Sequence, residues 1–79
     1  MNCHYIVVRE TYTDKTCSRT TYGIAAVQKN DGCLSVIQSI SDICPEFAAV
    51  QQLVQRCNEL ELELIHLQDV VEDFLIETY

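Results

Sequence analysis

Apolar and polar positions in the first half of the chain follow the pattern of β-strands. Three stretches, 4–12, 20–28 and 33–41, are rich in β-branched and aromatic residues and lack the 3.6-residue period of a helix. The tetrapeptide Lys-Asn-Asp-Gly at 29–32 favours a tight hairpin turn between the second and third stretches. Because the connections are short, the pattern predicts a three-stranded antiparallel meander with the second strand in the centre.

The second half of the chain has the period of two amphipathic helices. On a helical wheel, residues 45–58 gather five apolar side chains within an arc of about 120°: Phe47, Val50, Leu53, Val54 and Cys57. Residues 63–77 gather six within about 140°: Leu64, Leu67, Val70, Val71, Phe74 and Leu75. Pro45 suits the first helical position, and Asn58 suits a left-handed residue that ends the first helix. The Glu-Leu alternation at 59–64 fits a short strand or a bend, and we predict a bend because the helical period resumes directly after it.

These elements predict an α+β fold, β-β-β-α-α, in a single small domain over residues 1–79 with both helices on one face of the sheet. Gly23, Ala25 and Ala26 make the central strand shallow, which lets a helix approach closely. In the third strand we place Leu34, Val36 and Ile40 on one side, and Ser35, Ile37 and Ser39 on the other.

An apolar surface without a cover follows from this fold. The segments 4–8 and 23–27 are apolar on both faces, but two helices cover only one face of a small sheet. Two isoleucines also interrupt the polar side of the last helix. The sequence therefore predicts a contact with another chain, and its candidate interface residues are Val8, Val27, Ile37, Ile65 and Ile76.

Charge narrows the choice of partner. The formal net charge is −7, with four bases against three acids in residues 1–33 and one base against nine acids in residues 34–79. Binding to nucleic acid or anionic lipid depends on clustered Lys and Arg, so we expect neither nucleic acid nor membrane as a partner. The chain also lacks an apolar run of about 20 residues and a recognisable signal peptide, so we expect a cytoplasmic protein.

Cysteine, histidine and the acidic residues are the candidates for chemistry. The odd number of five cysteines, without closely spaced pairs, argues against a disulfide framework and the usual zinc-binding spacings. A small metal- or thiol-dependent protein remains the alternative, through convergence of scattered ligands: Cys3, Cys17, Cys33, Cys44, His4 and His66. Cys57 lies on the apolar stripe of the first helix and is interpreted as a core thiol.

An acidic face on the last helix is the remaining candidate site. His66, Asp69, Asp73 and Glu77 lie within about 80° of each other on the wheel. Such a face holds a cation when a second helix adds ligands, and it catalyses when a pocket desolvates a carboxylate. The polar side of the first helix offers only Gln and Arg, so a solvated face is favoured. We expect no catalytic, metal-binding or cofactor-binding residue, and thus no enzyme.

Four segments resemble a known family: YGIAAV at 22–27, VIQSISDIC at 36–44, LVQRCN at 53–58 and HLQDVVEDFL at 66–75. They are similar to a family of small uncharacterised proteins from anaerobic Gram-positive, Clostridia-like bacteria, over about residues 20–76. That family is a domain of unknown function, so the resemblance implies no activity, cofactor or site residue. The sequence alone therefore predicts a non-enzymatic protein-interaction module that associates with itself, as a homodimer, or with an unknown protein partner.

Overall fold

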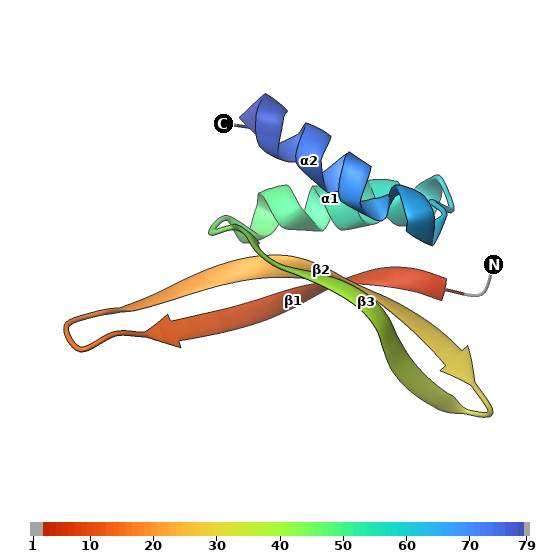
Figure 1. Ribbon diagram of the computed structural model, residues 1–79, viewed down its shortest axis with the longest axis horizontal. Helices are drawn as coiled ribbons and strands as arrows, with labels where there is room; N and C mark the ends of the chain where they lie inside the picture. The colour runs from red at the N-terminus through yellow and green to blue at the C-terminus, as the bar shows by residue number, and fades with distance from the viewer. Residues whose placement is uncertain (1–2, 79) are drawn as a thin grey trace.

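A computed structural model describes residues 3–78 as one antiparallel sheet with two helices on one of its faces (Figure 1). The strands are β1 (Cys3–Thr13), β2 (Ser18–Asn30) and β3 (Cys33–Cys44), in the order β1-β2-β3. The helices are α1 (Phe47–Glu59) and α2 (Leu67–Thr78), and the 3₁₀ turn η1 (Leu64–His66) leads into α2. The predicted β-β-β-α-α order and the central position of the second strand are confirmed.

The hairpin between β2 and β3 forms where the sequence predicts it. Asp31 and Gly32 both have positive φ, 52° and 83°, as the two central residues of a tight hairpin turn require. The turn sets Asn30 opposite Cys33 and, further along, Val27 opposite Val36.

Strand β3 does not keep one alternation throughout, which corrects the predicted faces. A register shift between Ala26 and Val27 leaves Ile37 without a partner residue on β2. This bulge puts Ile40 on the same face as the core residue Ile24, while Val36 shares the opposite face with Val27. Leu34 and Val36 therefore do not lie on the side of Ile40, because one extra residue reverses the alternation.

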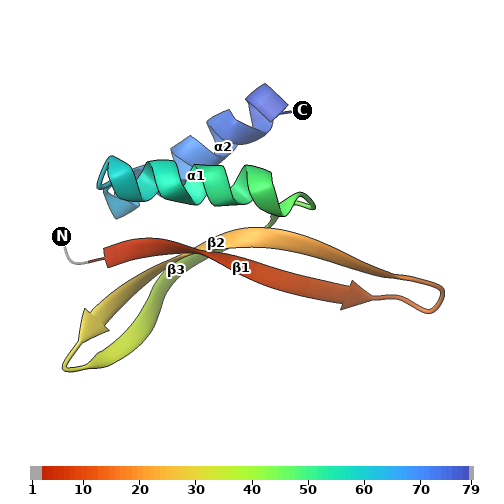
Figure 2. The same ribbon diagram turned by 180° about the vertical axis from the view of Figure 1, so that it is seen from behind.

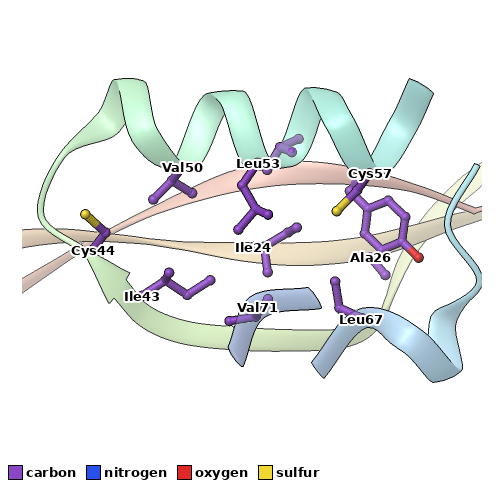
Figure 3. Close-up of a cluster of buried hydrophobic side chains, with 11 residues drawn as sticks. Ile24, Ala26, Ile43, Cys44, Val50, Leu53, Cys57, Leu67 and Val71 are labelled. Atoms are coloured by element: carbon purple, nitrogen blue, oxygen red, sulfur yellow. The ribbon is translucent and has the colours of Figure 1, made fainter. Parts of the chain in front are cut away.

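The helices bury one face of the sheet. Helix α1 lies mainly over β1 and β2, and α2 lies over β3, so that their buried side chains meet those of the strands (Figure 3). The predicted stripe of α1 is buried at Val50, Leu53, Val54 and Cys57, whereas Phe47 is half exposed. The core also takes side chains from all three strands and from α2: Tyr5, Ile24, Ala26, Ile43, Cys44, Leu67 and Val71.

The ends of α1 differ from those predicted. The helix begins at Phe47 after Glu46, so Pro45 precedes it, and the Cys44 thiol accepts a hydrogen bond from the Glu46 N–H at 3.5 Å. Asn58 remains helical, and the left-handed residue is Glu61, with φ 49°. The N–H groups of Glu61 and Leu62 donate to carbonyls of the last helical turn, so a bend, not a strand, joins α1 to η1.

Candidate interaction surface

The face of the sheet that points away from the helices is largely apolar, and neither helix of residues 3–78 covers it (Figure 2), although the neighbouring strands bury its centre on β2. We call it the open face. Its side chains follow from strand alternation: those facing the helices are Tyr5, Val7, Ile24 and Ala26, so their neighbours Ile6, Val8, Ala25 and Val27 face the other way. On β3 the open face continues through Val36 and Leu34, which pair with Val27 and Lys29.

The open face has raised borders and a shallow centre. The borders carry Ile6 on β1 and Leu34 and Val36 on β3, whose exposed fractions are 40, 65 and 63 %. The centre is β2, where Gly23 and Ala25 are small and buried. The two hairpins, β1–β2 and β2–β3, bend away from the helices at opposite ends of the sheet, so the open face lies on the inside of an arch (Figure 1). A second surface that enters the arch therefore meets apolar side chains on both sides.

The five predicted interface residues fall in two separate places. Val8, Val27 and Ile37 belong to the sheet: Val8 is half-buried, Ile37 is exposed at the bulge, and Val27 is buried between its neighbours. Ile65 and Ile76 are 78 and 76 % exposed, but they belong to the helical layer on the other side of the sheet. One flat interface cannot include both groups.

Sequence reasoning did not select Ile6, Leu34 and Val36, although the signal was present. Ile6 shares a strand face with Val8, and the Asp31–Gly32 turn by itself sets Val36 opposite Val27 and Leu34 opposite Lys29. Counting outward from the turn places both β3 residues on the open face. The position of Ile40 beyond the bulge is not available from such a count.

One end of the open face is polar. The Arg19 guanidinium forms an ion pair with Asp42 at 3.2 Å and lies over the ring of Tyr12, 5.6 Å from its centroid. The Tyr12 hydroxyl donates to the Glu10 carboxylate, which raises the pKa of Tyr12. Beside this network the Thr21 hydroxyl oxygen is buried without a hydrogen-bond partner within residues 3–78. Buried hydroxyls normally have one.

Charge is divided between the two sides of the molecule. The charged residues of the open face are two bases and two acids, Arg19 and Lys29 with Glu10 and Asp42, so this face is close to neutral. All eight acids from Glu46 onward belong to the helices and their connections, where Arg56 is the single Lys or Arg. The net negative charge of the chain therefore lies on the helical side.

Most of the scattered cysteines and histidines lie far apart in the fold. Cys17 and Cys33 are exposed near the two hairpin turns, at opposite ends of the sheet, whereas Cys44 is buried. Within the described residues no three His, Cys, Asp or Glu side chains gather as metal ligands would. His66, Asp69, Asp73 and Glu77 on the predicted acidic face are all exposed.

A pocket of about 420 Å³ lies at the edge of β1, where β1 meets the link between α1 and η1. Its lining is Cys3, His4, Tyr5, Cys57, Asn58, Glu61, Leu62 and Glu63. The Asn58 side chain accepts from the Tyr5 N–H at 2.8 Å and donates to the Tyr5 carbonyl at 2.9 Å. Burial raises the pKa of the Cys57 thiol, so this thiol is a poor nucleophile at neutral pH. At this pocket, the end of α1 is therefore hydrogen-bonded to the edge strand β1.

The Tyr5 hydroxyl makes the stability of the folded protein depend on pH. It donates to the Leu62 carbonyl at 2.6 Å, and burial, with the nearby Cys3 and Cys57, raises the pKa of Tyr5 from 10.0 to about 12. Above pH 10 unfolded Tyr5 loses its proton while folded Tyr5 keeps it, so stability falls as the pH rises from 10 to 12. We expect the stability advantage of the wild type over Tyr5→Phe to be constant below pH 10 and to shrink above it, as measured by urea unfolding. We expect the wild type to be more stable than Tyr5→Phe by on the order of 1 kcal/mol at pH 9. The same difference in stability at pH 11.5 would contradict this role of the Tyr5 hydroxyl.

A scan against protein-family models places residues 1–77 in the Family of unknown function (DUF6514). The chain belongs to this family. The match extends the expected resemblance over nearly the whole chain, and it confirms membership of a domain family without an assigned function. Searches of curated proteins and of solved structures found no match. In the described part of this DUF6514 member, neither helix has the length and apolar character needed to cross a membrane.

Proposed function

We propose that this DUF6514 protein is a non-enzymatic interaction module that associates with a second copy of itself through the open face. The observation that carries the proposal is the set of exposed apolar side chains on a sheet face that neither helix covers, Ile6, Leu34 and Val36, with Ile37 exposed at the bulge beside them. Exposed apolar patches on small domains mark interaction surfaces. The expected cytoplasmic location and bacterial source are part of the same proposal.

Shape supports a second copy as the occupant. Because the open face carries raised borders and a shallow centre, the border of one copy fits the centre of the other, as a two-fold interface requires. Three strands about 4.8 Å apart and about eleven residues long give a face on the order of 500 Å². Two such faces total about 1,000 Å², the lower limit for a specific interface.

Charge supports the same occupant. Two copies that meet through their near-neutral open faces keep their acidic helices on the outside, where mutual repulsion is weakest. An orientation with the strands antiparallel also sets the Lys29 end of one face over the Glu10 end of the other.

Light scattering with a matched pair of variants tests self-association. We expect the molar mass to rise from monomer to dimer between about 1 and 500 µM, the range for an interface of this size. Val36→Glu puts a charge on the open face at an already exposed position, so it should shift the midpoint to at least about tenfold higher concentration without unfolding the chain. Ile65→Glu adds the same charge on the helical side and should leave the midpoint unchanged.

Two results would contradict the proposal. A wild-type protein that stays monomeric up to about 500 µM has no such interface at the affinity expected for it. If Ile65→Glu dissociates the dimer and Val36→Glu does not, the dimer forms through the helical side instead. Circular dichroism of each variant checks that the fold is intact.

A further inference from the structure

A groove of about 490 Å³ separates the two helices on the side of the molecule opposite the open face. Helix α1 contributes Ala49, Gln52, Leu53 and Arg56, the residue after it contributes Leu60, and α2 contributes Val70, Asp73, Phe74 and Glu77.

The groove exists because the helices do not pack along their whole length. Helix α2 touches the sheet near its beginning and then rises away from it toward its C-terminus (Figures 1 and 2). Val70 and Phe74 are consequently only partly buried, and Leu60, directly after α1, is 70 % exposed. The fold leaves apolar surface between its own helices that no described residue fills.

The two rims of the groove have opposite charge. Asp73 and Glu77 line the side of α2, and Arg56 lines the side of α1 together with Gln52. Within residues 3–78 the single ion pair closer than 4 Å is Arg19–Asp42, on the sheet, so the rim charges are not neutralised across the groove. Two residues of the acidic face identified in the sequence, Asp73 and Glu77, thus border a groove that also has apolar side chains.

We propose that this groove docks an amphipathic helix of another protein, with basic residues along one flank of its apolar stripe. A helix presents apolar anchors at i, i+3, i+4 and i+7, which match a groove with an apolar floor. Its Lys or Arg flank faces Asp73 and Glu77, and a polar or acidic flank faces Arg56 and Gln52. A second copy of this chain does not supply such a helix, because α1 and α2 hold one base between them, Arg56.

A leucine–lysine peptide is the probe. We would use a helical peptide of about 14 residues with leucines at i, i+3, i+4 and i+7, and a scrambled peptide of equal composition with its leucines spread around the helix. Fluorescence anisotropy at about 0.15 M salt, where long-range attraction is screened, measures binding to the full-length protein. We expect the scrambled peptide to bind at least about tenfold more weakly.

Paired variants separate the groove from general attraction to an acidic protein. Leu60→Ser removes an exposed apolar contact and should weaken binding of the probe about tenfold, with little effect on folding. The double variant Asp73→Asn with Glu77→Gln should weaken binding of the probe about fivefold or more. The control is Glu59→Gln with Glu72→Gln, which changes the net charge by the same amount outside the groove. It should weaken binding less than about twofold. Four results would each overturn the proposal. The two peptides bind equally, or Leu60→Ser has no effect on binding. Alternatively, the two double variants have equal effects, or no binding is seen at about 1 mM probe.

Discussion

Leu67→Ala is expected to lower the free energy of unfolding by about 3 kcal/mol. The Leu67 side chain is completely buried in the core, close to Val71 and facing the sheet (Figure 3). Its truncation removes apolar contacts and leaves a cavity, because the neighbouring side chains on the strands are fixed by their own packing. A domain of this size has a total stability on the order of 5 kcal/mol, so the variant should keep only a small part of it.

Urea unfolding followed by circular dichroism measures this loss, and Ile65→Ala is the matched control. Ile65 is an apolar residue two positions earlier and is 78 % exposed, so its truncation should cost less than about 0.5 kcal/mol. Equal losses in the two variants would show that Leu67 does not occupy the core. The pair also tests the start of α2, since a 12-residue helix depends on tertiary contacts to persist.

Gly23→Ala should destabilise the protein by about 3 kcal/mol, near the upper limit for overpacking. A Cβ atom at Gly23 would collide with the Ile40 carbonyl oxygen and lie 3.1 Å from the Ser41 Cα. Both atoms are backbone, so the strand itself has to move. The close approach results from the register shift between Tyr22 and Ile24, which brings extra residues of β3 against the centre of β2.

Substitutions at Gly32 serve as the comparison, because glycine is favoured there by its backbone conformation and not by a close contact. An added Cβ at Gly32 meets no atom within 4 Å, but its φ of 83° disfavours other residues. Gly32→Ala should cost about 1 kcal/mol and Gly32→Asn less, since Asn tolerates positive φ. At Gly23 both substitutions should be severe, with Asn at least as harmful as Ala. Similar rankings at the two positions in thermal unfolding would contradict the close contact with β3.

The two proposed surfaces lie on opposite sides of the sheet, so that both can be occupied at once. A dimer closed through the open faces exposes two acidic helical layers, each with its own groove. Self-association would then present two equal docking sites, and a partner with two suitable helices would gain avidity. The Val36→Glu and Leu60→Ser experiments distinguish the surfaces, because each variant alters one and leaves the other intact.

Local pattern was enough to predict most of the elements. The positions of the three strands, the Asp31–Gly32 turn and the buried stripe of α1 depend on residues close in sequence, and all are present in the structure. The use of Ala26 beneath the helices was also predictable, since a small side chain on a core-facing strand permits close approach. Gly23 and Ala25 have another role, because they lie on the open face and not beneath the helices.

The order of elements, the excess of acid in the second half and the surplus of apolar strand surface over what two helices can cover all follow from the residues alone. These properties depend on composition and short-range periodicity. Three features arise only when the chain is folded: the bulge at Ile37, the hydrogen bonds of Asn58 to the backbone of β1, and the divergence of α2 from α1. Each depends on contacts between residues distant in sequence, whose packing and hydrogen bonding override local preference.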